Sequence, residues 1–236
     1  MTRTCLLCFT FWSGCLFAQV IDHQQMIDHA AVEYLQVAGN QSALFYGSEH
    51  EGHSPRILNH PYFIDTQFAK ARLSYGDIIY PEVLLRMDLN RKELVAQLPG
   101  YRNIVLFPEN VNFAELHGKT IIYFRNDSLP GCPSTGYYLL LFSGKCKVLE
   151  RNFAELTQNT QSTRFEQRFV LSTQFFLFKD DVYYLIRNKR ALLKVLYPYK
   201  KELKRFISTN RLYFRSDTEK LLILTVGEYE KLSGAL

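Results

Sequence analysis

The densest group of side chains able to do chemistry is the run His50-Glu51-Gly52-His53, with His60 ten residues after His50. Imidazole and carboxylate groups bind zinc, and two histidines three residues apart can reach one ion. The metalloprotease helix has a different spacing, with two histidines four residues apart and Glu after the first. The glycine in this run and the nearby Pro55 also disfavour a helix. We therefore expect a solvated loop without a metal, and a metal site here would use His50, His53 and His60.

Four carboxylates could serve as a general acid and base, namely Glu82, Asp88, Asp180 and Asp181. Such a pair acts only at a suitable separation, which the sequence does not fix. Asp180-Asp181 is more simply interpreted as a turn. The sequence contains neither a Gly-x-Ser-x-Gly elbow nor a glycine-rich phosphate loop. No catalytic residue and no cofactor are assigned, and the pattern favours a protein that is not an enzyme.

A basic segment near the C-terminus could bind an anionic partner. It contains Lys200, Lys201, Lys204 and Arg205, and residues 186–236 hold 12 Lys+Arg against 5 Asp+Glu, a net charge of +7. Since the whole chain carries +5, the remainder sums to −2. An envelope protein or a membrane surface would fit this charge. The alternative is a solvated helix face that covers a sheet edge.

The first 18 residues are typical of a secretory signal peptide: a positive charge at Arg3, a short apolar run and a small residue at Ala18. Cleavage after Ala18 is one route. The alternative is a lipoprotein, because Ser13-Gly14-Cys15 is similar to the end of a lipobox and would place a lipid on Cys15. We expect an exported protein in the periplasm or associated with the outer membrane, and therefore no nucleic-acid partner.

Removal of the signal peptide changes the cysteine count. Cys5, Cys8 and Cys15 belong to it, so the spacing of Cys5 and Cys8 is not a redox motif, and after cleavage at Ala18 only Cys132 and Cys146 remain. In an oxidising compartment this pair could close a disulfide, worth roughly 3 kcal/mol. The sequence leaves open whether they pair or stay as thiols.

The composition indicates one globular domain over residues 19–236. The chain has 236 residues, of which 47% are hydrophobic and 22% charged, which excludes a disordered chain. No apolar run after the N-terminus is long enough for a transmembrane helix. We divide the domain into a β-rich body over about 40–187 and a basic helical segment over about 188–236.

Alternating apolar residues predict strands through the body. Ala69–Tyr75 alternates apolar and polar residues, Gly76-Asp77 ends it, and Pro81 in the next strand marks an edge or a bulge. The continuous apolar run Tyr137–Phe142 is typical of a strand buried on both faces. Further strands are expected over 94–98, 103–107, 111–116, 119–125, 145–151, 164–171, 174–178 and 182–187.

Helical spacing predicts an amphipathic helix within residues 21–37 and about three short helices at the C-terminus. The first of these covers 188–196. The second covers 199–208, with Tyr199, Leu203, Phe206 and Ile207 on one face. The third begins at a capping box, Ser216-Asp217-Thr218-Glu219, and runs to Leu232.

Several segments together resemble a group of uncharacterised exported proteins that are common in Bacteroidota. The segments, in order, are His60-Pro61-Tyr62-Phe63, Tyr75–Tyr80, Val83–Leu89, Gly136-Tyr137-Tyr138, Ser143-Gly144-Lys145, Tyr183–Ile186 and Lys189–Lys194. They cover most of the mature chain. The resemblance implies export from a Gram-negative bacterium and a β-rich fold with C-terminal helices. It implies no catalytic motif, ligand or function.

The fold class expected is α+β: a curved, predominantly antiparallel β meander with an N-terminal helix and about three short C-terminal helices. The first functional hypothesis is an uncharacterised cell-envelope protein that binds a protein partner or a small apolar ligand without catalysis. The alternative is an envelope hydrolase acting on glycan, peptidoglycan or peptide through the histidine loop or an acid pair. A structural subunit of an envelope assembly is the third. The sequence does not fix the oligomeric state.

Overall fold

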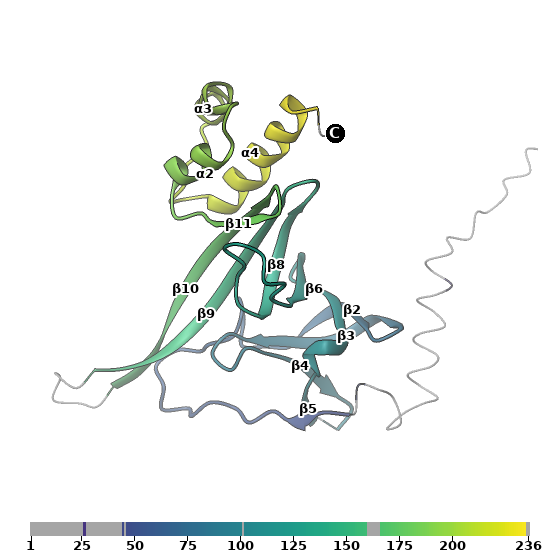
Figure 1. Cartoon of the computed structure of the whole chain (residues 1–236). Helices are drawn as coiled ribbons and strands as arrows, with labels where there is room; N and C mark the ends of the chain where they lie inside the picture. Colours follow the sequence, from purple (N-terminus) through teal and green to yellow (C-terminus); the bar gives the residue numbers. More distant parts are fainter. Residues whose placement is uncertain (1–25, 27–43, 45, 101, 160–165, 235–236) are drawn as a thin grey trace, which may run out of the picture.

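The computed structural model describes Met26, Leu44 and residues 46–100, 102–159 and 166–234. They form one twisted antiparallel sheet of eleven strands and three α-helices that gather at one end of it (Figure 1). The sheet is open, with β1 and β11 as its edges. The signal segment 1–18 and, apart from Met26, the helix predicted within 21–37 lie outside the described residues.

The strands are ordered β1-β5-β4-β3-β2-β6-β7-β8-β9-β10-β11 across the sheet. Their bounds are β1 Ser48–Glu49, β2 Ala69–Tyr75, β3 Ile78–Asp88, β4 Glu93–Leu98, β5 Arg102–Val105, β6 Val111–Leu116, β7 Lys119–Phe124, β8 Gly136–Ser143, β9 Lys147–Asn159, β10 Glu166–Lys179 and β11 Val182–Leu185. The α+β class with a mainly antiparallel sheet, expected from the sequence, is confirmed, but the strands do not form one uninterrupted meander. After β5 the chain returns through a 3-10 turn, Pro108–Asn110, and β6 pairs with β2, so two meanders share one sheet.

Local patterns in β2 and β3 are confirmed. The apolar side chains of Ala71, Leu73 and Tyr75 are buried, and the two strands are joined at Gly76, which has a φ of +58°. The register shifts between Ala71 and Leu73, whose partners on β3 are Val83 and Tyr80. Two residues of β3, the first of them Pro81, therefore lie opposite one residue of β2, which is the bulge that proline predicted.

The core lies on both faces of the sheet. The largest cluster of buried side chains comes mainly from β2 to β8 and includes Tyr137 and Leu139 of β8. Tyr138, between them in sequence, is buried on the opposite face against Phe176 and Tyr183. The apolar run in β8 is therefore buried on both sides, as the sequence predicted.

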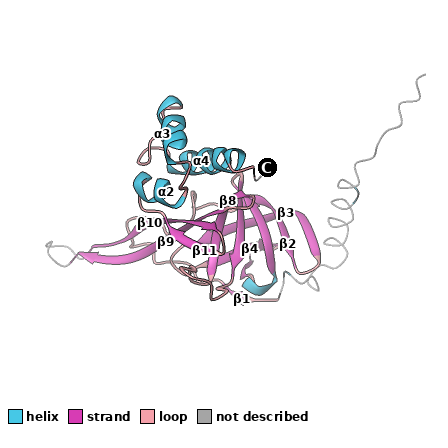
Figure 2. Ribbon diagram, turned by 45° about the horizontal axis from the view of Figure 1, so that its top comes forward, coloured by secondary structure: helices cyan, strands magenta, loops and turns pink. Residues whose placement is uncertain are grey.

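Three helices cover one end of the sheet (Figure 2): α2 Lys189–Val195, α3 Lys200–Thr209 and α4 Thr218–Leu232. Asn188 caps α2, because its side chain accepts a hydrogen bond from the Ala191 N–H at 2.9 Å. Leu203 and Ile207 of α3 are buried, which confirms the predicted amphipathic face. We call α2, α3, α4 and their connections the helical unit. In the described part of the chain, no helix has the length and apolar character needed to cross a membrane.

The capping box predicted for α4 is wrong, although the helix is present. Asp217 occupies the N-cap position without a capping hydrogen bond from its side chain. The hydroxyl of Thr218 donates to the Phe214 carbonyl instead, and Glu219 pairs with Lys119 of β7. A tertiary ion pair has replaced the local cap.

Cys132 and Cys146 are free thiols. Cys132 is in the β7–β8 connection, whereas Cys146 is buried in the β8–β9 turn against the helical unit. Burial, followed by the neighbouring Glu230 carboxylate, raises the pKa of the Cys146 thiol to about 11. Of the two possibilities that the sequence left open, the structure has Cys132 and Cys146 as thiols and not as a disulfide.

A buried carboxylate joins α4 to the β8–β9 turn. Glu230 is only 1% exposed, and its Oε1 accepts a hydrogen bond from the Cys146 N–H at 2.6 Å. A Cβ built on Gly144 would lie 2.3 Å from Glu230 Oε2 and 2.6 Å from Oε1. Glycine is required here because the carboxylate occupies the space of a side chain.

We predict that Gly144→Ala lowers the free energy of unfolding by about 1–3 kcal/mol, because the methyl group displaces Glu230 and leaves the Cys146 N–H without its acceptor. Urea unfolding would measure this loss. Gly52→Ala is the matched control, since a Cβ at Gly52 meets no atom within 4 Å and should change stability little. Equal stability of the two variants would contradict the assignment.

Candidate functional site

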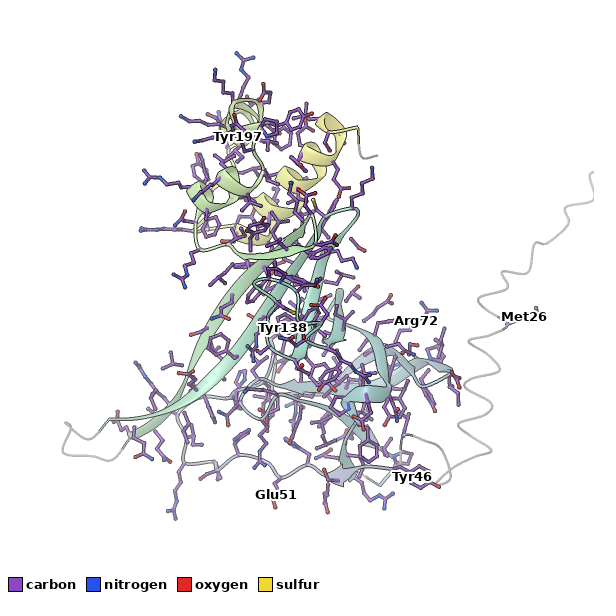
Figure 3. All side chains as sticks on the ribbon, in the orientation of Figure 1. Met26, Tyr46, Glu51, Arg72, Tyr138 and Tyr197 are labelled. Carbon is purple, nitrogen blue, oxygen red and sulfur yellow. The ribbon has the colours of Figure 1, made fainter. Side chains whose placement is uncertain are left out.

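The histidine loop is not solvated as expected. His50 is buried, its Nδ1 lies 2.9 Å from Glu93 Oε2, and its backbone N–H donates to the Asn103 carbonyl at 2.8 Å. Glu51, between the two histidines, points away from the sheet (Figure 3) and its side chain is 83% exposed. The loop therefore inserts His50 between strands and leaves its carboxylate neighbour in solvent.

Asp88, at the end of β3, is the centre of this network. Its side chain is fully buried, and His53 Nε2 lies 2.5 Å from Oδ2, while His50 Nε2 lies 3.8 Å from the same oxygen. The backbone N–H groups of Asn90 and Arg91 donate to Oδ1, each at 2.9 Å. His53 and two backbone amides thus hydrogen-bond one buried carboxylate, and the buried His50 ring lies beside it.

The third histidine does not join the other two. His60 stacks on Tyr62, with ring centroids 6.1 Å apart, and the guanidinium of Arg86 lies 3.8 Å from the centre of the same ring. Burial raises the pKa of the Tyr62 hydroxyl. Within the described residues, no group of three or more His, Cys, Asp or Glu side chains has a geometry that could hold a metal ion.

The loop also contacts β10, which is far from β3 in the strand order of the sheet. The His53 ring meets the Phe169 ring edge-on at 5.0 Å. Asn59 pairs with the Phe169 backbone twice, donating to its carbonyl at 2.8 Å and accepting from its N–H at 2.7 Å. The histidine network therefore ties β3, β4 and β10 together through buried contacts. This is the geometry of a structural clamp.

The other carboxylates singled out from the sequence lie apart from one another. Glu82 forms an exposed ion pair with Lys70 on β2. Asp180 and Asp181 form the β10–β11 turn with φ of +52° and +57°, and Asp180 pairs with Lys179. The structure brings none of these three to Asp88, and the turn interpretation of Asp180-Asp181 is confirmed.

A cavity of about 640 Å³ lies where the first turn of α4 meets β9 and β10. We call it the junction cavity. Phe175, Ile223 and Leu224 supply its apolar wall, and Glu150 of β9 is its most buried polar residue, at 5% exposure. The remaining lining residues are Thr173, Arg215, Ser216, Asp217, Thr218, Glu219 and Lys220.

The two oxygens of Glu150 differ in their surroundings. Oε1 accepts a hydrogen bond from the Asn152 side-chain amide at 2.7 Å, whereas Oε2 is buried without a hydrogen-bond donor among the described residues. Burial raises the pKa of Glu150 to about 6; the negative charge of Glu219 and a hydrogen bond between the two carboxyl groups add to this, and Asn152 and Lys119 oppose it. A buried carboxylate with a free oxygen is exceptional in a folded protein.

Sequence reasoning missed Glu150. Glu150 lies in β9 directly after Val148 and Leu149, which are in the core, and before a half-buried stretch of the same strand. An acidic residue directly after two core positions is the signal that could have found it. Glu219 was singled out only as a helix cap, and its pairing with Lys119 joins residues 100 positions apart.

The basic segment forms an exposed face of α3. Lys200, Lys201, Lys204 and Arg205 are all exposed, and they flank the stripe of buried Leu203 and Ile207. Among the described residues, no ion pair involves these four cations. We call them the basic face. A second basic group on the helical unit, Arg187, Lys189, Arg190 and Arg215, lines a hollow of about 700 Å³.

Comparisons with known proteins provide no relative from which a function could be transferred: no family model, curated protein or solved structure matches this chain.

Proposed function

We propose that this chain is an exported protein of the Gram-negative cell envelope that acts by binding an acidic partner protein, without catalysis. The basic face of α3 carries the proposal. Four exposed cations that form no ion pair in the described structure outnumber the one acid between them, Glu202, and create a positive potential that attracts an acidic surface. They project from the helical unit, where the chain concentrates its positive charge.

The packing of α3 favours a protein partner over insertion into a membrane. A helix that lies in a bilayer interface needs a free apolar face. In α3 that face is already used, because Leu203 and Ile207 are buried in the helical unit with Leu222 and Val226 of α4. Contact with a membrane would therefore depend on headgroup charge alone.

The packing of the core favours a function at the protein surface over the transport of an apolar ligand in an internal cavity. Large side chains fill the main core cluster, among them Tyr80, Leu85 and Leu116, each at most 1% exposed. The volume that a carrier would keep open for a ligand is occupied here by the protein's own side chains.

The test is the triple variant Lys200→Glu, Lys201→Glu, Lys204→Glu. We expect at least a tenfold loss of co-sedimentation with isolated cell envelopes at low salt, because three attractive charges become repulsive. Association of the unchanged protein should weaken as salt is raised. Vesicles of anionic phospholipid, without protein, form a parallel arm that should bind at least tenfold more weakly than envelopes.

The control reverses three exposed cations on the sheet, Lys92→Glu, Lys145→Glu and Arg168→Glu, with the same change in net charge. It should keep envelope association. If the α3 variant bound cell envelopes as well as the unchanged protein, the proposed docking face would be wrong. Equal loss in both triples would assign the effect to net charge, and equal binding to pure lipid vesicles would make the partner a membrane.

A further inference from the structure

The junction cavity contains an acceptor that lacks a donor. Glu150 Oε2 is buried without a donor among the described residues, whereas Oε1 accepts from Asn152; the carboxyl group of Glu219 is close enough to share a proton with Glu150 when one of the two is protonated. Leaving a buried carboxylate oxygen unpaired costs free energy that folding normally avoids. When both carboxyl groups are ionised no proton remains between them, so the missing group is a donor, and a cationic donor would bind most strongly.

The charged groups described around Glu150 do not donate a hydrogen bond to its Oε2. Lys119 of β7 is a cation whose charge acts on Glu150, but it pairs with Glu219 of α4. Arg215, Asp217 and Lys220 also line the cavity, and Lys220 lies 3.9 Å from Asp217. The two carboxylates of Glu150 and Glu219 repel one another, so a cation placed between them would relieve that repulsion.

The cavity beside these carboxylates has room for a small molecule and an apolar wall. Its volume of about 640 Å³ is within the range of ordinary ligand pockets. Phe175 of β10 and Ile223 and Leu224 of α4 form the apolar side, and Leu224 is 39% exposed. The Glu219 side chain is 35% exposed, so a ligand can reach its carboxylate from solvent.

We propose that the junction cavity binds a small aliphatic amine, with its ammonium group on Glu150 and Glu219 and its alkyl chain against Phe175, Ile223 and Leu224. The site is independent of the basic face and of the partner proposed above. It extends the protein from a docking module to one that also recognises a small cationic molecule at the junction between sheet and helical unit.

The test is a titration with n-hexylamine, followed by the methyl NMR signals of Ile223 and Leu224, with 1-hexanol as the uncharged match. At about pH 7.5 we expect saturable shifts of these methyl groups and at least tenfold tighter binding of the amine than of the alcohol. At about pH 5 that preference should fall by up to about tenfold, because Glu150, whose pKa is about 6, is then largely neutral.

Two variants identify the residues. Glu150→Gln should reduce amine affinity at least tenfold, to the level of the alcohol, whereas Glu155→Gln, an exposed carboxylate on the same strand, should not. Glu219→Gln should also weaken binding, since one carboxylate is lost and Lys119 is released toward Glu150. Equal affinity for amine and alcohol, or unchanged affinity in Glu150→Gln, would overturn the proposal and leave a proton shared by the two carboxylates as the explanation of the site.

The result is separable from the proposed docking function. The α3 triple variant should bind hexylamine as the unchanged protein does, and Glu150→Gln should still co-sediment with envelopes. Failure of one assay therefore does not decide the other.

Discussion

Replacing Asp88 by alanine is expected to lower the free energy of unfolding by about 3–5 kcal/mol, because the substitution removes the shared acceptor of a buried network. His53 would lose its partner at 2.5 Å, and the N–H groups of Asn90 and Arg91 would lose theirs at 2.9 Å. Urea unfolding at neutral pH, followed by circular dichroism, measures the change.

Asp88→Asn is the matched control for this prediction. An asparagine keeps one side-chain oxygen for the two backbone amides and loses only the charge and the second acceptor, so the loss should be about 1–2 kcal/mol. His60→Gln should have a smaller effect than either, since His60 contacts Tyr62 and not Asp88. Little loss in Asp88→Ala would show that the loop is not clamped through this carboxylate.

The elements of this fold that could be predicted are those whose causes lie within a few residues. The alternation of β2 and the turn at Gly76 depend on backbone sterics and on burial of one face. The amphipathic α3 was predicted for the same reason. Each of these signals is complete within the segment that it describes.

Pairing between distant segments could not be obtained in this way. Nothing within Val111–Leu116 indicates that β6 pairs with β2 instead of with β5, because the choice depends on how the whole sheet buries its core. The histidine loop shows the same limit. Its glycine and proline suggested exposure, yet partners 43 and 35 residues further on, Glu93 and Asp88, draw its histidines into the protein.

The two candidate sites differ in the same way: one depends on a local pattern and the other on contacts between distant segments. The basic face was visible because helical spacing alone places its cations together. The junction cavity was not, since it combines Glu150 of β9, Lys119 of β7 and Glu219 of α4, three positions with no shared local pattern. An acid on a buried strand indicates that a partner is needed, but only the tertiary structure identifies which partner is missing.

Glu150→Gln is expected to change the pH dependence of stability. Burial raises the pKa of Glu150 to about 6 from an ordinary value of 4.5, so the folded protein holds this proton more tightly than the unfolded chain. Below about pH 4.5 Glu150 is protonated in both the folded and the unfolded protein, so its ionisation does not affect stability. As the pH rises through 6, ionisation of Glu150 removes about 2 kcal/mol of stability, the equivalent of a shift of about 1.5 pKa units.

Glutamine resembles the protonated acid in shape and does not ionise. The variant should therefore match the unchanged protein below about pH 4.5 and exceed its unfolding free energy by about 2 kcal/mol above pH 7. Urea unfolding of both proteins from about pH 4 to pH 8, with Glu155→Gln as the exposed control, gives the difference curve. A lower stability of Glu150→Gln at neutral pH would mean that attraction to Lys119 outweighs the burial of the charge. The junction would then be held together by an ion network instead of strained by an unpaired carboxylate.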